Sequence, residues 1–186
     1  MEKFKFAIIE LVETFIVSFL VIFMIYQFIA SMEVVSGASM EPNFDTGQRI
    51  LVDKVSPLFK PFRRGEVVVL TPPNDLDKHY IKRIIGLPGD IIKIFECKVY
   101  IIASGEQYEL KEDYLSKDTC TTGGIMLTDG RSMQLNSDEY IVLGDNRTYS
   151  VDSRYFGVVT RKELLGRVIF RFWPLNVAGF FKIGKT

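Results

Sequence analysis

The sequence predicts a mainly β domain of antiparallel sheets, carried on a single N-terminal transmembrane helix. Three observations support this prediction. Residues 14–32 contain no charged side chain. The later apolar segments are short and are separated by turns rich in Gly and Pro. Of the 186 residues, 47% are hydrophobic, which is enough for a packed core. This length fits one modest domain with an appendage.

The N-terminal apolar segment is long enough to cross a bilayer. Its 19 residues, from Thr14 to Met32, would extend about 28 Å as a helix. A cleaved signal peptide has a shorter apolar region, although residues 36–38 (Ser-Gly-Ala) have the small-x-small form of a cleavage site. A buried core helix normally carries a polar stripe, which this segment lacks. We therefore expect residues 1–32 to be a retained membrane anchor and residues 33–186 to be the folded domain that it carries.

The positions of Lys and Arg predict the orientation of this anchor. Lys3 and Lys5 precede the apolar segment, and Arg49 is the first basic residue after it. The positive-inside rule then places the N-terminus in the cytoplasm. The domain is expected outside the cytoplasm, at the outer surface of the plasma membrane.

Six segments of the domain are expected to form strands. They lie at 48–55, 66–70, 79–85, 91–102, 139–143 and 167–173. Dense turn signals follow some of them, as in residues 86–90 (Gly-Leu-Pro-Gly-Asp). Residues 96–138 are richer in Ser, Thr, Gly, Asp and Lys, and we interpret them as a small β insertion. Short strands separated by such turns are typical of a β-sandwich or a β-barrel.

The insertion contains the two cysteines of the chain, Cys97 and Cys120. In an extracytoplasmic domain a disulfide between them is permitted. Two buried thiols that act as small apolar side chains are the alternative. Sequence alone does not decide between these two states, because it does not give the distance between the Cα atoms.

Several classes of function are disfavoured by composition and motif. The 23 basic residues balance the 23 acidic ones, and no Lys/Arg block is present, so nucleic acid is not an expected partner. The single histidine, His79, rules out a metal centre of two or three His ligands, and we expect no metal. A Gly-x-Ser-x-Gly motif and a phosphate-binding Gly-Lys-Ser/Thr loop are both missing.

A serine with a lysine is the remaining candidate for catalysis. Ser39 lies in a small-residue loop, where a substrate backbone can approach closely. Lys82 lies in an apolar strand, where desolvation can lower its pKa from near 10.4 toward 7–8 and make it a general base. Judged by residue type alone, a serine in such a loop is more often only a turn residue, and a lysine in a strand is more often solvated.

Four sequence boxes follow the apolar segment in order. They are Ser-Met-Glu-Pro at 39–42, Arg-Gly-Glu-Val-Val-Val at 64–69, Tyr-Ile-Lys-Arg-Ile-Ile-Gly-Leu-Pro-Gly-Asp at 80–90, and Gly-Asp-Asn-Arg-Thr-Tyr-Ser-Val-Asp-Ser-Arg at 144–154. Together they resemble the boxes of bacterial type I signal peptidases, the leader peptidases with a Ser-Lys dyad. The resemblance covers nearly the whole chain, and the last two boxes are long and specific.

The resemblance implies a role for each matching residue. Ser39 would be the nucleophile of a serine endopeptidase, Lys82 its general base, and Ser150 the hydroxyl that orients the lysine. A supporting ion-pair network would consist of Asp145, Arg147, Asp152 and Arg154. Pockets for small substrate side chains would be lined by Met40, Tyr80, Ile81, Val142 and Leu143.

Two positions near the dyad need separate interpretation. Some family members carry a serine two places before the nucleophile, and its hydroxyl completes the oxyanion hole. Here that place holds Gly37, as in the Gram-positive type with its single anchor. The backbone N–H of Ser39 remains one donor, and we expect a backbone N–H near Gly37, or a water, as the second. His79 lies three residues before Lys82, on the opposite face of a strand, and is interpreted as structural.

The resemblance also implies the substrate. Secreted preproteins would bind in an extended form, with Ala-like residues at −1 and −3, and their signal peptides would be removed without a cofactor. The aromatic tail would lie on the bilayer or pack in the core; its members are Phe170, Phe172, Trp173, Phe180 and Phe181. A self-cleaving Ser-Lys repressor, which predicts a DNA-binding module and no membrane span, is one alternative. A membrane-tethered binding domain, with Ser39 far from Lys82, is the other.

Overall fold

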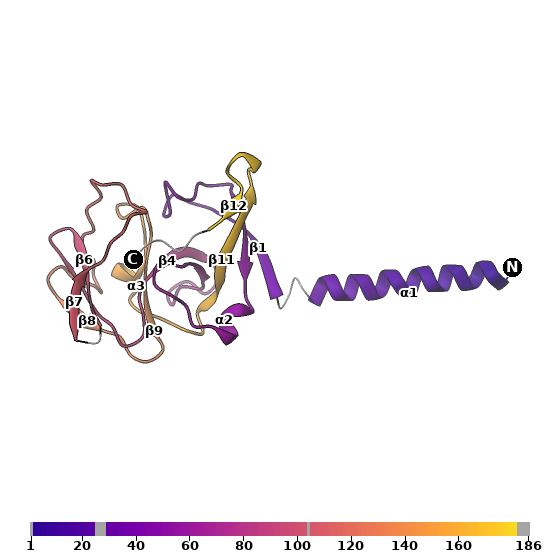
Figure 1. Ribbon diagram of the computed structural model, residues 1–186, viewed down its shortest axis with the longest axis horizontal. Coiled ribbons are helices and arrows are strands. Elements are labelled where there is room, and N and C mark those ends of the chain that lie inside the picture. The colour runs from indigo at the N-terminus through magenta and orange to yellow at the C-terminus, as the bar shows by residue number, and fades with distance from the viewer. Residues whose placement is uncertain (1, 25–28, 104, 182–186) are drawn as a thin grey trace.

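The computed structural model describes residues 2–24, 29–103 and 105–181. Helix α1 covers Glu2–Met24 and lies apart from the sheets in Figure 1. By length and composition, Lys3–Met24 could cross a membrane, and none of its apolar window is buried in the protein. Eight uncharged residues with large apolar side chains between Thr14 and Met24 are therefore exposed.

The expected end of the anchor at Met32 is wrong. The helix begins earlier and its described part ends at Met24, whereas Ala30–Val34 form strand β1. Strand β1 pairs with β2, which covers Arg49–Asp53. Both a membrane helix and an apolar strand are uncharged, so hydropathy does not separate them. The remaining part of the predicted span, residues 25–28, lies outside the described residues.

The main sheet has eight strands, and Lys82 lies on its strand β4. Its order is β1-β2-β11-β3-β4-β9-β10, with β12 paired to β11, and every recorded pairing is antiparallel. The bounds of the strands not yet given are Val67–Leu70 for β3, Tyr80–Gly86 for β4, Glu139–Leu143 for β9, Val159–Thr160 for β10, Leu164–Trp173 for β11 and Gly179–Phe180 for β12.

A second sheet of four antiparallel strands forms the insertion. Its order is β7-β6-β5-β8, with bounds Ile91–Phe95 for β5, Lys98–Ala103 for β6, Glu106–Glu109 for β7 and Ser132–Gln134 for β8. Figure 1 shows this sheet at the end of the domain away from α1. The expected single strand over 91–102 is thus a hairpin, and the insertion begins at Ile91 rather than near residue 96.

The disulfide between Cys97 and Cys120 is present in the structure. It joins the turn of the β5–β6 hairpin to the loop that leads to Thr121, whose N–H donates to the Cys97 carbonyl oxygen at 3.0 Å. The alternative of two buried thiols is therefore wrong.

Three short helical turns and three apolar clusters complete the domain. The turns are α2 at Ser56–Phe59, α3 at Ser153–Phe156 and the 3-10 turn η2 at Leu175–Val177. One cluster joins the two sheets and includes Ile85, Ile92 and Ile141. A second lies beneath the loop of Ser39 and includes Met40 and Phe44. This packing fixes the loop against the main sheet.

Candidate active site

The domain has a groove of about 430 Å³ between the segment that follows β1 and the start of β4. Ser39 and Lys82 lie in its wall, one from each side. The other lining residues are Glu33, Val34, Val35, Ser36, Gly37, Ala38, Ile50, Val69, Lys78, His79, Tyr80, Ile81, Tyr149 and Val151. The lining is mostly apolar, as expected for a site that receives an extended apolar segment.

Ser39 and Lys82 are in direct contact in this groove. Lys82 Nζ lies 2.8 Å from Ser39 Oγ, within hydrogen-bond distance, and it also donates to the Ile81 carbonyl oxygen at 3.0 Å. This is the geometry that a nucleophile and its base require. It contradicts the alternative of a binding domain with the two residues far apart.

The environment of Lys82 favours the neutral amine. Only 3% of the residue is exposed, because β4 lies between β3 and β9 in the sheet. Burial lowers its pKa from 10.5 to about 8, despite the opposing effect of the Asp152 and Asp145 carboxylates. Lys82 is therefore partly unprotonated at mildly alkaline pH, where a solvated lysine is still charged.

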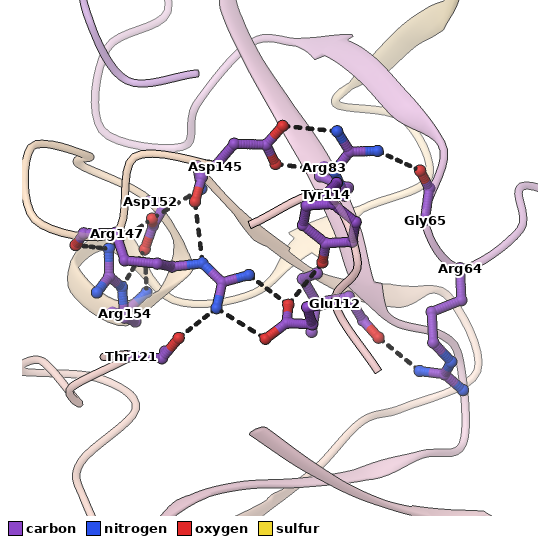
Figure 2. Close-up of polar contacts among 12 residues, drawn as sticks. Arg64, Gly65, Arg83, Glu112, Tyr114, Thr121, Asp145, Arg147, Asp152 and Arg154 are labelled. Carbon is purple, nitrogen blue, oxygen red and sulfur yellow. Dashed lines mark hydrogen bonds and ion pairs between the residues drawn. The ribbon is translucent and has the colours of Figure 1, made fainter. Parts of the chain in front are cut away.

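Two buried ion pairs lie near Lys82. Figure 2 shows both pairs. The Arg83 guanidinium donates to both carboxylate oxygens of Asp145, at 2.8 and 2.6 Å. Arg154 donates to both oxygens of Asp152, each at 2.9 Å. Asp152 also caps α3 and accepts from the Gly144 N–H at 2.9 Å. The four groups are nearly inaccessible to solvent, so each charge needs its partner.

The loop of residues 144–150 is docked directly onto the nucleophile. The Asn146 N–H donates to the Ser39 carbonyl oxygen at 3.0 Å, and the Asp145 N–H lies 3.4 Å from Met40 Sδ. Gly144 allows this close approach, since a Cβ there would lie 2.4 Å from the Ser39 oxygen and 2.1 Å from Ser150 Oγ.

This geometry was compared with known proteins. The model of the family described as "Signal peptidase, peptidase S26" matches residues 8–173. The chain belongs to the signal peptidase family. It is 36% identical to signal peptidase I of Bacillus amyloliquefaciens, over 92% of this chain and 91% of that one. It is 32% identical to signal peptidase IB of Staphylococcus aureus (strain COL), over 91% of each.

A solved structure is also similar. The crystal structure of a signal peptidase I from Enterococcus faecalis matches with a TM-score of 0.47 and 29% identity, over 58% of this chain and 97% of that one.

Membership of the signal peptidase family confirms the resemblance that the four boxes predicted. It makes the chain a serine endopeptidase of the type that removes signal peptides, and with the apolar helix α1 it fits a membrane-anchored enzyme. The alternative of a self-cleaving repressor, which predicted a DNA-binding module, is wrong.

The expected hydrogen bond from Ser150 to Lys82 is not present in this signal peptidase. Ser150 Oγ is buried, and no described residue is its hydrogen-bond partner. The hydroxyl instead faces Gly144, at the point where the 144–150 loop meets the Ser39 backbone. A buried hydroxyl without a partner is unusual and points to a functional demand on the position.

The two expected oxyanion donors differ in whether their N–H groups are already hydrogen-bonded. Among the described residues, none accepts a hydrogen bond from the Ser39 N–H, so this donor is free. The Gly37 N–H already donates to Thr46 Oγ1 at 3.1 Å. The Gly37 N–H is thus already hydrogen-bonded in this structure, and another backbone N–H near Gly37, or a water, stays the prediction for the second donor. At φ +89°, Gly37 serves the turn instead, since a side chain there would be strained.

The residues expected to line the substrate pockets fall into two groups. Tyr80 and Ile81 do line the groove. Met40, Val142 and Leu143 are fully buried in the apolar clusters and do not line it. Val142 and Leu143 lie on β9, where four successive residues are buried and the strand is therefore covered on both faces.

His79 lies in the wall of the groove, and not on the opposite face as expected. Its Nδ1 is 3.7 Å from Glu33 Oε1, and half of its side chain is exposed. The residue precedes β4, so the alternation of a strand does not apply to it. Among the described residues, no cluster of three or more His, Cys, Asp or Glu side chains could hold a metal ion.

Sequence reasoning missed Arg83, the partner of Asp145, and three residues of the insertion that join this network. Glu112 pairs with Arg147, Tyr114 lies against Arg83 with 3.9 Å between the guanidinium carbon and the ring centre, and Thr121 Oγ1 accepts from Arg147. All three come from the insertion, which we had expected to lie outside the catalytic core. No local motif marks them.

Proposed function

We propose that the chain removes N-terminal signal peptides from secreted preproteins, with Ser39 as the nucleophile and neutral Lys82 as the general base. The observation that carries this proposal is the contact of 2.8 Å between Lys82 Nζ and Ser39 Oγ in the wall of an apolar groove. Family membership supports the substrate class. The dyad supplies the chemistry.

Proton transfer would begin with neutral Lys82. As Ser39 Oγ attacks the scissile carbonyl carbon, the hydroxyl proton moves to Nζ. The Ser39 N–H faces the oxyanion that develops. The Lys82 ammonium then gives its proton to the leaving amine, and the mature protein departs. A water, deprotonated by Lys82, attacks the remaining ester and releases the signal peptide with the Ser39 hydroxyl restored.

The groove suits an extended peptide with small side chains near the scissile bond. Val35 and Ala38 come from one wall, and Tyr80 and Ile81 from the other. Extended backbone on either side lets a substrate strand pair with the walls. Small side chains at −1 and −3 would fill the shallow spaces between these residues.

Ser150 completes the dyad in this proposal. Its Oγ is buried without a partner, and Lys82 Nζ has recorded partners for two of its protons. A hydrogen bond from the protonated Nζ to Ser150 Oγ, formed when substrate is bound, would satisfy both groups. In the neutral amine, an N–H donated to Ser150 Oγ would leave the lone pair of Lys82 directed toward Ser39.

The domain would work at the outer surface of the plasma membrane, with the N-terminus in the cytoplasm. Lys3 and Lys5 precede the bulk of the apolar helix, which supports this orientation. The aromatic tail divides into two parts. Phe181 stacks on Phe44 in the core, with ring centres 4.3 Å apart. Trp173 and Phe180 are exposed at 50% and 81%, and they are suited to contact lipid.

Two substitutions test the function. The purified chain in detergent is incubated with a preprotein, and cleavage is followed by electrophoresis. Ser39→Ala and Lys82→Met should each abolish processing while circular dichroism shows an intact fold. Processing by either folded variant at the rate of the unaltered chain would remove that residue from the mechanism.

A further inference from the structure

The position of the nucleophile depends on the loop of residues 144–150. The Asn146 N–H holds the Ser39 carbonyl oxygen at 3.0 Å, and Gly144 brings the two backbones into contact. A displacement of this loop would therefore move Ser39 relative to Lys82. The residues that hold this loop in place therefore help to set the distance between Ser39 and Lys82.

Arg147 is the charged anchor of this loop. Its side chain is fully buried, and its Nε donates to the Gly144 carbonyl oxygen at 3.0 Å. Arg154 in turn donates to the Arg147 carbonyl oxygen at 2.8 Å. A buried guanidinium needs a carboxylate close by, because an uncompensated charge in the interior is strongly unfavourable.

That carboxylate does not come from the box at residues 144–154. Asp145 forms its ion pair with Arg83, and Asp152 forms its ion pair with Arg154. Arg147 instead pairs with Glu112, which follows β7 in the second sheet, and one of the two contacts is 3.0 Å from Nη1 to Oε2 (Figure 2). The Glu112 side chain is 11% exposed.

Tyr114 connects the same segment to the other side of the dyad. Its hydroxyl donates to Glu112 Oε1 at 2.5 Å, and its ring lies against Arg83, the neighbour of Lys82. Its carbonyl oxygen accepts from Asn43 Nδ2 at 2.9 Å, and that amide also donates to Asp145 at 2.9 Å. The segment therefore touches the nucleophile loop, the base strand and the 144–150 loop.

We propose that Glu112 is a positioning residue: by neutralising Arg147, it holds the 144–150 loop, and through it Ser39, in the geometry that Lys82 requires. The second sheet is then a working part of the active site. This inference rests on the proposed function. Neither Glu112 nor Arg147 lines the groove, and Tyr149 is the one residue of the 144–150 loop among its lining residues, so Glu112 should affect the chemical step and leave substrate binding nearly unchanged.

The test compares steady-state cleavage of a preprotein by the unaltered full chain and four variants of it in detergent. Glu112→Gln removes the charge and should lower kcat about tenfold or more, with KM within twofold, since small misplacements of catalytic groups have effects of this size. Glu109→Gln is the matched control. It breaks an exposed pair with Lys98 in the same sheet and should leave both constants unchanged. Arg147→Gln and the double variant with both Glu112→Gln and Arg147→Gln complete a double-mutant cycle.

The double variant gives a readout that a merely structural role would not move. With Arg147 already neutral, the loss of the Glu112 charge should cause no further fall in kcat. Multiplying effects, or a folded Glu112→Gln variant with unchanged kcat, would overturn the proposal. If Glu112→Gln does not fold, Tyr114→Phe takes its place, because it removes only the hydroxyl bond to Glu112. It should lower kcat severalfold with KM unchanged, and an unchanged kcat would overturn the proposal.

These arms also separate this inference from the proposed function. If the unaltered chain and Glu109→Gln cleave the preprotein and Ser39→Ala does not, the function stands whatever Glu112→Gln does. If the unaltered chain fails to cleave, the proposed function fails first.

Discussion

Lys82 Nζ lies 2.8 Å from Ser39 Oγ and is buried at the centre of the main sheet. The burial that makes this amine a base also makes its charged form unfavourable. Catalysis and stability therefore place opposite demands on one side chain.

Replacement of Lys82 by Met should stabilise the fold at neutral pH. The pKa of Lys82 is about 8 in the folded chain and 10.5 without burial. Below pH 8 both states are protonated, and the folded state bears the full cost of the buried charge, about 3 kcal/mol. Between pH 8 and 10.5 the folded state loses its proton first, so the stability of the unaltered chain rises with pH.

Thermal denaturation in detergent checks this prediction. At pH 7 the Tm of Lys82→Met should exceed that of the unaltered chain by about 6–12 °C. The difference should shrink as pH rises through 8 toward 10.5. A variant that is less stable at pH 7 would mean that Lys82 is held charged by its neighbours.

Gly144→Ala should abolish processing. A Cβ at this position would lie 2.1 Å from Ser150 Oγ and 2.4 Å from the Ser39 carbonyl oxygen, so the nucleophile loop must move. We expect kcat/KM to fall at least a hundredfold, measured on a preprotein. Gly179→Ala is the control, since its Cβ would meet no atom within 4 Å. Equal activity of the two variants would contradict the tight docking of the loop.

Ser150→Ala should separate activity from stability. The hydroxyl is buried without a partner, so its loss should leave the Tm unchanged or raise it. The rate should nevertheless fall, if Ser150 orients Lys82 during the reaction. Ser153→Ala provides the contrast, because Ser153 Oγ accepts from the Val142 N–H at 3.0 Å. It should lower stability by about 1 kcal/mol. Full activity of Ser150→Ala would remove the serine from the mechanism.

The disulfide should contribute to the stability of the second sheet. Cys97 and Cys120 are 23 positions apart, and the closure of such a loop is worth about 3 kcal/mol. The double substitution to Ala should therefore lower the Tm by several degrees. Because the linked loop carries Thr121, a partner of Arg147, kcat should fall as well. A Tm unchanged by the substitution would show that the loop is ordered without the bond.

The sequence predicted the parts of this molecule that depend on local pattern. Strands β2, β3, β4, β9 and most of β11 follow the predicted apolar runs, whereas β1 was expected within the membrane span. The boxes around Ser39 and Lys82 singled out the two residues that the fold brings into contact. The hairpin of β5 and β6 was missed because its turn uses Glu96 and Cys97, at φ 49° and 65°, where Gly or Asn is the usual signal.

The network behind the dyad was only partly predictable. Asp152 and Arg154 lie two positions apart, so their box revealed them together. Glu112 and Arg147 lie 35 positions apart, in segments with no shared motif, and only the fold brings them into contact. The hydrogen bond from the Gly37 N–H to Thr46 Oγ1 likewise depends on a turn geometry that a sequence does not specify.

The pH dependence of kcat/KM for preprotein cleavage tests the central claim most directly. If neutral Lys82 is the base for Ser39, the rate should rise with a single apparent pKa of about 8, the value that burial gives this amine. A rise centred near 10.5, the value of a solvated lysine, would contradict the account, and so would a rate independent of pH between 6 and 10.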